Sequence, residues 1–275
     1  MIGLRNDKKI LKEIIRKKKR EYFEDDNFRI GYCEQSRFSN NTDFCFDVYA
    51  IGYDTIINKI KNKGCRLDGK FEVRGGFMGY EYHEAEKYIT NKVQESDNFK
   101  KIITPSLISP YRILWGSKSI NIFNKTFTKL YLLYNQDIRK SLWTFFKSKK
   151  IVVRGIAKRT CAALDREGFA LLVNIFGLLP KNNEDNMVLT MAILNSKLAD
   201  FYHKIHFFLA RIPEGSLRYP KPFWETFPIV TLESSNNRIT SKIEKQVNGL
   251  IHKIKLQNKI NNFPQSYMEN LEEEF

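Results

Sequence analysis

Few residue pairs in this sequence have a spacing that supports catalysis. Asp68 and Lys70, in the segment LDGK, have the D-x-K spacing of metal-dependent nucleases, in which a carboxylate holds a divalent ion. No convincing acidic partner precedes this pair. His203 and His206 are three residues apart and could share a helix face, but they lack a carboxylate partner for a metal site. A nuclease based on Asp68 therefore remains one alternative function.

Motifs of nucleotide-dependent and hydrolytic enzymes are absent from the sequence. There is no G-x-G, hence no Rossmann-type nucleotide or S-adenosylmethionine loop, no G-x-x-x-x-G-K-[ST] and no G-x-S-x-G. No two prolines are adjacent, so the N-P-P-Y motif of amino-methylating DNA methyltransferases is missing as well. The four cysteines form no C-x-x-C pair, which favours thiols in a reducing cytoplasm over a zinc site. We expect a chain that binds rather than catalyses, with no metal site.

The charge of the chain points to a polyanionic partner. Lys and Arg number 46 against 31 Asp and Glu, a formal net charge of +15. Such an excess favours nucleic acid first and an anionic membrane surface second. Hydrophobic residues make up 42% of the chain, enough for a core, but no apolar run reaches the ~18 residues of a membrane span. The abundance of Lys, Asn and Ile is also typical of AT-rich genomes, so charge alone leaves the partner open.

Three parts of the chain differ in composition. Residues 1–30 form a basic leader with a narrow apolar stripe, which predicts a short exposed helix. Residues 31–231 mix strand-like and helix-like patterns and form the main folded domain. Residues 232–275 comprise the amphipathic closing helix NNRITSKIEKQVNGLIHKIKLQNKI and the acidic tail ENLEEEF.

Glycines and β-branched residues mark turns and strands within the main domain. YDTIINKIKNKG predicts a short helix ending at Gly64. KFEVRGGFMGY predicts a strand that enters a turn, whose glycines allow positive φ or close approach of another backbone. Residues 149–155 predict a further strand, and DREG predicts a hairpin turn between two more strands. The second of these, 169–176, is apolar on both faces and should be buried on both sides.

The segment 187–208 has the strongest helical pattern. Its apolar residues recur every three or four positions, which predicts a helix of roughly six turns that packs against a sheet. They are Met187, Met191, Leu194, Leu198, Phe201, Ile205 and Phe208. Together, these patterns predict an α+β fold with an antiparallel or mixed β-sheet braced by a long amphipathic helix, and with flanking N- and C-terminal helices.

Arginine and lysine side chains on loops are the residues best suited to duplex DNA. Both hold phosphates, and arginine also pairs with base edges in the major groove. The loop ARIPEGSLRYPKPFWETFPIV, with four of the eight prolines, is a candidate contact surface. The candidate DNA-binding residues are Arg74 at the glycine turn, Arg112 and Lys118 in the middle loop, Arg154, Lys158 and Arg159 beside the strands, and Arg211, Arg218 and Lys221 in the proline loop.

Several segments in order resemble one known domain family. The segments are KIVVRG, the turn LDREG, the helix AILNSKLADFY, the loop RYPKPFWETFPI and the closing helix IEKQVNGLIHKIK. Upstream, VRGGFMGYEYHEAEKY and LISPYRILWGSKS add to the similarity. Together, at about residues 65–260, they resemble the TaqI-like C-terminal specificity domain of adenine-specific DNA methyltransferases, which also occurs in fused type II restriction-modification enzymes.

The resemblance implies a function for residues 31–231. They would be a target recognition domain that reads a short duplex DNA sequence, without catalytic activity of its own, while a methyltransferase domain or subunit methylates an adenine. S-adenosylmethionine would bind that separate domain, and this chain would need no cofactor. Members of the family differ most in their recognition residues, so none is carried over by motif.

Three alternatives to DNA recognition stay open. The first is the metal-dependent nuclease with Asp68 and Lys70. The second is a protein-interaction subunit of a restriction-modification complex, whose closing helix docks a partner. The third is attachment to a membrane surface through residues 1–20.

Overall fold

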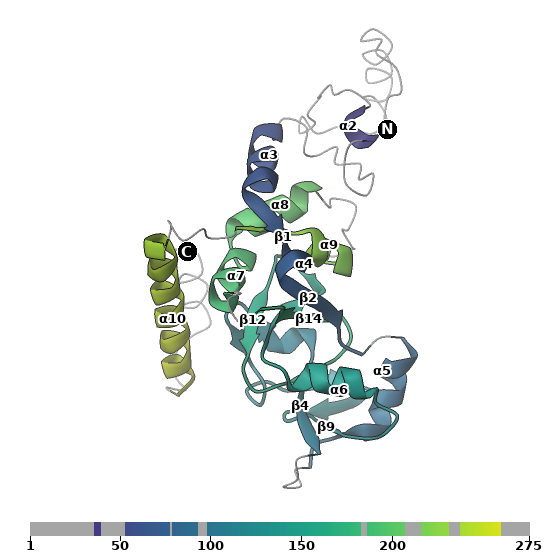
Figure 1. Cartoon of the computed structure of the whole chain (residues 1–275). Coiled ribbons are helices and arrows are strands. Elements are labelled where there is room, and N and C mark those ends of the chain that lie inside the picture. The colour runs from purple at the N-terminus through teal and green to yellow at the C-terminus, as the bar shows by residue number, and fades with distance from the viewer. Residues whose placement is uncertain are drawn as a thin grey trace, which may run out of the picture.

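The computed structural model describes residues 36–39, 53–77, 79–92, 98–182, 186–206, 216–230 and 237–259 (Figure 1). Its helices are α2 (Ser36–Ser39), α3 (Asp54–Lys63), α4 (Leu67–Lys70), α5 (Tyr80–Ala85), α6 (Lys140–Lys147), α7 (Met187–Leu194), α8 (Lys197–His206), α9 (Lys221–Thr226) and α10 (Asn237–Lys259), with 3₁₀ turns η3 (Glu86–Tyr88) and η4 (Pro105–Leu107). Its strands are β1 (Gly64–Arg66), β2 (Phe71–Gly75), β3 (Ile89–Thr90), β4 (Phe99–Ile103), β5 (Ile108–Ser109), β6 (Arg112–Ile113), β7 (Ile120–Ile122), β8 (Lys125–Phe127), β9 (Tyr131–Leu133), β10 (Lys150–Arg154), β11 (Ile156–Ala157), β12 (Ala162–Asp165), β13 (Ala170–Leu171), β14 (Ile175–Pro180), β15 (Leu217–Arg218) and β16 (Pro228–Val230).

A four-stranded antiparallel sheet lies at the centre, in the order β12-β10-β14-β2. The β-branched residues Ile151, Val152 and Val153 of β10 are fully buried, as suits an inner strand covered on both faces. Successive side chains of a strand point to opposite faces. Ile151 and Val153 accordingly belong to one hydrophobic core, and Val152 belongs to the other.

Each face of this sheet carries one core. The first core includes residues of α7, α8 and α9, with Phe223 and Trp224 fully buried. The second lies between the sheet, α6 and a mixed sheet of order β13-β4-β9-β3, in which only β13 and β4 are parallel. Figure 1 shows α7, α8 and α9 in the upper part of the molecule and α5, α6, β4 and β9 in the lower part. The predicted α+β class with antiparallel and mixed sheets is confirmed.

The DREG turn is not the hairpin that the sequence predicts. β12 before it pairs with β10, whereas β13 after it pairs with β4, so the turn carries the chain from one sheet to the other. The predicted strand 169–176 is likewise two strands, β13 and β14, separated by Asn174 with φ of 60°. Burial on both sides is confirmed, because Phe169, Ala170, Leu171, Leu172, Ile175 and Phe176 are all buried.

The long helix expected over 187–208 is divided into α7 and α8. α7 ends at Leu194, and the Asn195 side chain then bonds to the edge of the central sheet. Its Oδ1 accepts from the Ala162 amide at 2.8 Å, and its Nδ2 donates to the Ala162 carbonyl at 2.9 Å. This pairing redirects the chain, and Leu198 of the predicted stripe is 54% exposed. Two helices therefore brace the sheet, and Phe208 lies outside the described residues.

Glycines allow close contact at two predicted positions. α3 ends at Lys63, next to the expected Gly64, but Gly64 is extended and begins β1. A Cβ on Gly64 would lie 2.9 Å from Pro228 Cβ, so close packing explains this glycine. At the glycine turn, a Cβ on Gly76 would lie only 2.2 Å from the Leu171 carbonyl oxygen. The predicted close approach of a second backbone is thus present there.

Gly76→Ala is expected to lower the free energy of unfolding by about 1–3 kcal/mol, because the new methyl group overlaps a buried backbone. Gly69→Ala is the matched control, since a Cβ there has no atom within 4 Å. In α4 the control should be neutral or stabilise the chain by up to about 1 kcal/mol. Urea unfolding of both variants checks this, and equal stabilities would contradict the role of Gly76.

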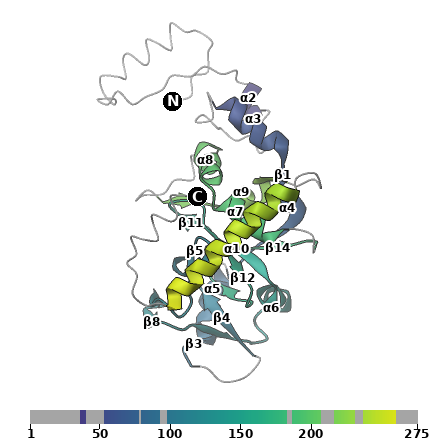
Figure 2. The ribbon, with the colours of Figure 1, turned by 90° about the vertical axis from the view of Figure 1, so that its left-hand side faces the viewer.

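The closing helix is observed as α10, which runs across α7 and β12 in Figure 2. Val247 and Ile254 are buried on its inner side. Asn186, which caps α7 through the Leu189 amide, also donates to Glu244 of α10. The expected helical leader, residues 1–30, lies outside the described residues. Among the helices that the structure describes, none has the length and hydrophobicity required to cross a bilayer.

Candidate nucleic-acid interface

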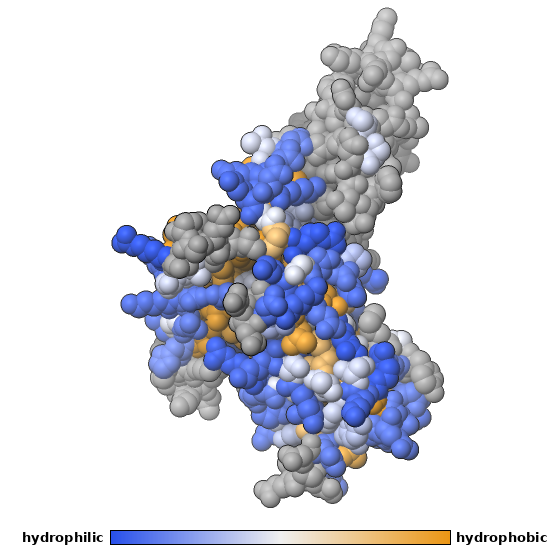
Figure 3. Space-filling model, viewed as in Figure 1, coloured by the Kyte–Doolittle hydropathy of each residue, from blue (hydrophilic) through white to orange (hydrophobic). Residues whose placement is uncertain are grey.

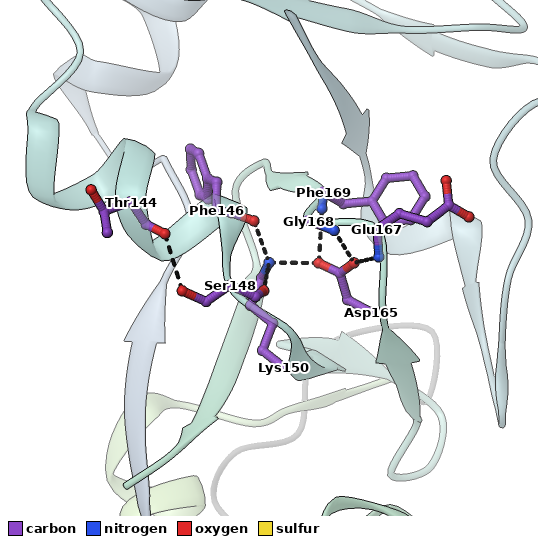
Figure 4. A network of polar contacts seen from close by, with 8 residues as sticks. All are labelled: Thr144, Phe146, Ser148, Lys150, Asp165, Glu167, Gly168 and Phe169. Atoms are coloured by element: carbon purple, nitrogen blue, oxygen red, sulfur yellow. Dashed lines mark hydrogen bonds and ion pairs between the residues drawn. The ribbon is translucent and has the colours of Figure 1, made fainter. Parts of the chain in front are cut away.

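A buried ion pair anchors the start of β10, the strand that ends at the candidate residue Arg154 and leads into the loop with Lys158 and Arg159. Lys150 and Asp165 are register partners with fully buried side chains, and Lys150 Nζ lies 2.5 Å from Asp165 Oδ2 (Figure 4). Lys150 Nζ also donates to the Phe146 and Ser148 carbonyls at 2.9 and 3.2 Å. Burial lowers the pKa of Lys150, and the Asp165 carboxylate opposes this shift. The ion pair therefore adds to the backbone hydrogen bonds that set the register of β10 with β12.

Asp165 also holds the turn that follows β12. Its Oδ1 accepts from the amides of Glu167 and Gly168 at 3.0 and 2.7 Å, and its Oδ2 accepts from the Phe169 amide at 2.8 Å. Gly168 has φ of 79°, which glycine adopts most readily. One carboxylate thus satisfies three backbone donors and one ammonium group. The start of β10 and the end of β12 are thus fixed together, at the end of the strand pair opposite the exposed basic turn.

That basic turn is the loop from Arg154 to Cys161, which joins β10 to β12. The Arg154 amide donates to the Cys161 carbonyl at 3.1 Å and closes the base of the loop. Within the loop, β11 pairs with β15, so Ile156 lies opposite Arg218 and Ala157 opposite Leu217. The proline loop of the sequence is thereby brought against the KIVVRG strand, more than fifty positions away in the chain.

An open pocket of about 400 Å³ lies beside this loop. Three of the predicted DNA-binding residues, Arg154, Lys158 and Arg159, line it together. Lys158 and Arg159 are exposed, whereas Arg154 is half-buried. The remaining lining residues are Pro110, Ile156, Ala157, Cys161 and Ser216. The structure therefore gathers a cationic site where the sequence shows only neighbouring basic residues.

Polar groups beside the pocket lie in a buried environment. Arg154 Nε is buried and makes no hydrogen bond to any other residue that the structure describes. Burial raises the pKa of Tyr219 far above its usual range, Asp200 adds to this, and the Arg154 charge opposes it. Arg154 and Asp200 therefore act electrostatically on the same phenol. A ligand that reaches Arg154 would be held under weak dielectric screening.

Arg218 and Lys221 lie next to this site on the other chain segment. Arg218 is exposed on β15, and its carbonyl oxygen lies 3.0 Å from His203 Nε2 of α8. Lys221 is exposed at the start of α9 and forms an ion pair with Glu225 at 3.1 Å. Arg218 thus extends the basic surface of the pocket, while Lys221 is partly neutralised by its partner.

Arg74, a further predicted DNA-contact residue, forms hydrogen bonds within the protein. Its guanidinium donates to the Ser141 carbonyl at 3.1 Å and to Ser141 Oγ at 3.0 Å, and it lies over the Phe145 ring. These contacts tie β2 to α6. The position of Arg74 therefore suits a structural role, and the structure does not bring it to the pocket.

The middle-loop candidates divide in the same way. Arg112 lies in the β5–β6 hairpin, whose turn contains the pocket residue Pro110. Lys118 is exposed just before β7, in the part of the molecule that holds the second core. Arg211 lies outside the described residues. Arg112 is thus near the pocket, and Lys118 belongs to a different surface.

The residues considered for catalysis are placed in structural contacts. Both carboxylate oxygens of Asp68 accept from Arg66, at 2.7 and 3.1 Å, and this lowers the pKa of Asp68. His203 is buried and stacks on Tyr219 with ring centroids 4.0 Å apart. Within the described ranges, no group of three or more His, Cys, Asp or Glu side chains is arranged to hold a metal ion.

Sequence reasoning missed Pro110 and Ser216 as pocket residues, and Asn195 as the residue that fixes the edge of the sheet. The register of β11 with β15 brings Ser216 to the pocket, and this pairing is not visible in local patterns. On the face shown in Figure 3, hydrophilic residues cover most of the surface, with hydrophobic groups between them.

Comparisons with known proteins bear on the same region. Residues 100–212 match the model of the TaqI-like C-terminal specificity domain. Among solved structures, the chain is similar to the type IIG restriction endonuclease BpuSI, with a TM-score of 0.47 and 11% sequence identity. This similarity covers 73% of the chain and 28% of the endonuclease, so the chain spans less than a third of that protein's length. None of the curated proteins matches the sequence. All the pocket residues except Ser216 lie within the matched segment.

Proposed function

We propose that the chain recognises a specific sequence of duplex DNA, because residues 100–212 match the model of the TaqI-like C-terminal specificity domain. In this proposal residues 31–231 are the target recognition domain, and they have no catalytic activity by themselves. A methyltransferase domain or subunit, adenine-specific and carrying S-adenosylmethionine, acts at the recognised site. The protein works in the cytoplasm, where a reducing environment keeps scattered cysteines as thiols.

The gathering of Arg154, Lys158 and Arg159 around one pocket, with Arg218 beside it, carries the proposal. Two segments far apart in the sequence supply these cations, so their meeting is a product of the fold. Phosphate contacts by such residues set the register of a protein on DNA, and arginine can also read guanine edges. The net charge of +15 adds a general attraction to the duplex.

Selection from a pool of random-sequence duplexes tests the proposal. The full chain, alone and joined to its methyltransferase domain, is expected to enrich one short sequence. Each mismatch in that sequence should weaken binding by about 1–3 kcal/mol. Enrichment of no sequence in either form would contradict sequence recognition, even if the chain retained general affinity for DNA.

A further inference from the structure

The pocket beside Arg154 is larger than the site that one phosphate group needs. Its volume of about 400 Å³ falls in the range of pockets that hold small organic ligands. The pocket is open to solvent, and Ser216, which precedes β15, is one of its lining residues. A group that projects from a larger molecule could therefore enter it.

The lining of the pocket has two chemical sides. Arg154, Lys158 and Arg159 provide positive charge, and Ser216 adds a hydroxyl group. Pro110, Ile156 and Ala157 provide an apolar wall. A ligand that satisfies both sides carries an anionic group next to a ring or another apolar body. A nucleotide has this combination, with its phosphate joined through a sugar to a flat base.

Arg154 supplies an independent sign that a ligand is accommodated. Its Nε is buried without a hydrogen-bond partner among the described residues, and so is Thr160 Oγ1 in the same loop. Buried polar groups of this kind are nearly always bonded in folded proteins. An anionic oxygen in the pocket would give the Arg154 guanidinium a charge-assisted hydrogen bond.

We propose that this pocket holds one nucleotide unit, with its phosphate on the cations and its sugar or base against the apolar wall. The proposal rests on the proposed DNA recognition and deepens it by naming the group that the pocket takes. The unit belongs either to a DNA strand or to a free mononucleotide. In the first case the pocket fixes the strand at one position, which sets the register of the whole domain on its site.

Two pocket variants and one control test the proposal with the full chain. Ile156→Trp fills the apolar side and leaves every charge in place, whereas Arg154→Gln removes the buried cation. Leu198→Trp adds the same ring on α8, where Leu198 is 54% exposed and does not line the pocket. Fluorescence anisotropy measures binding to a labelled 20-base-pair duplex at low salt, with 2′-deoxynucleoside 5′-monophosphates as competitors. Thermal unfolding establishes that each variant is folded.

Both pocket variants are expected to weaken duplex binding about tenfold, with Leu198→Trp unchanged. Competition by the mononucleotides would indicate that the free ligand also fits, and its absence would assign the pocket to a DNA strand. Unchanged duplex binding in Ile156→Trp and Arg154→Gln would overturn the pocket proposal and leave DNA recognition standing. If Ile156→Trp does not fold, duplex binding by Arg154→Gln alone tests the pocket proposal.

Failure of the wild-type chain to bind duplex would instead count against DNA recognition. Direct titration with the mononucleotides would then show whether the pocket binds a nucleotide. Binding that Ile156→Trp abolishes would support a nucleotide site, and no binding would overturn it.

Discussion

Replacing Asp165 with alanine is expected to lower the free energy of unfolding by about 3–5 kcal/mol, the largest effect of any change proposed for this chain. The carboxylate is fully buried and accepts from Lys150 Nζ and from the amides of Glu167, Gly168 and Phe169. Its removal leaves an ammonium group and three backbone donors without their acceptor inside the fold. Such orphaned groups keep the cost of desolvation and lose the compensating bonds.

Urea unfolding measures this effect, and Glu167→Ala is the control. Glu167 pairs with Lys101 at 2.6 Å in the same turn, but the two side chains are 58% and 40% exposed, so its loss should cost less than about 1 kcal/mol. Adding Lys150→Met to Asp165→Ala should restore part of the stability, because the unpaired charge disappears with its partner. Additive losses in the double variant would contradict the coupling of the pair.

Neutralising the two exposed cations of the basic turn together with Arg218 beside it is expected to have the largest effect on DNA binding. The triple variant Lys158→Gln, Arg159→Gln and Arg218→Gln should bind duplex DNA about 100-fold more weakly near 0.15 M salt, if each side chain neutralises one phosphate. All three are exposed, so the fold should be retained. Anisotropy titrations of the wild-type chain and of this variant give the ratio directly.

The matched control removes the same charge elsewhere. Lys242, Lys245 and Lys253 are exposed on α10, and their replacement by glutamine changes the net charge by the same amount. The control should lose much less affinity than the basic-turn variant. An equal loss in both would show that binding follows the total charge of +15 and that the basic turn is no preferred site.

Local patterns in the sequence predict the elements well where hydrophobic periodicity is strong. The strand at 149–155, the helix that ends before Gly64 and the closing helix are all present, because burial of both faces determines the strand and burial of one face determines each helix. Phe169–Leu172, Ile175 and Phe176 are buried as expected, whereas Asn174 between the two strands is exposed. The apolar patterns predict the observed α+β class, the family resemblance indicates the candidate role of the central segment, and the matched residues 100–212 lie within its expected extent.

Long-range side-chain contacts explain what the sequence did not predict. The stripe over 187–208 has no gap, yet the Asn195 amide bonds to Ala162 and divides the helix. The turn after Asp165 likewise leads from one sheet to the other, because β13 pairs with β4 and not with β12, and the Asp165 carboxylate holds the turn amides in this arrangement. The local sequence around Asn195 or Asp165 does not identify the backbone groups that each side chain binds.

The candidate DNA-binding residues show the same limit. Loop chemistry indicates nine basic residues, and the structure brings Arg154, Lys158 and Arg159 together while it holds Arg74 against Ser141. Which arginine is occupied depends on the packing of β2 against α6. Which arginines meet depends on the register of β11 with β15. Both the packing and the register are properties of the tertiary structure.

A salt titration of duplex binding by the full chain tests the central claim most directly. The logarithm of the association constant should fall linearly with the logarithm of the salt concentration, with a slope of about −0.9 for each phosphate neutralised. If Lys158, Arg159 and Arg218 hold one phosphate each, the triple variant should have a slope that is shallower by about 2.7. Absence of duplex binding at low salt, or an affinity that does not change with salt, would contradict the account.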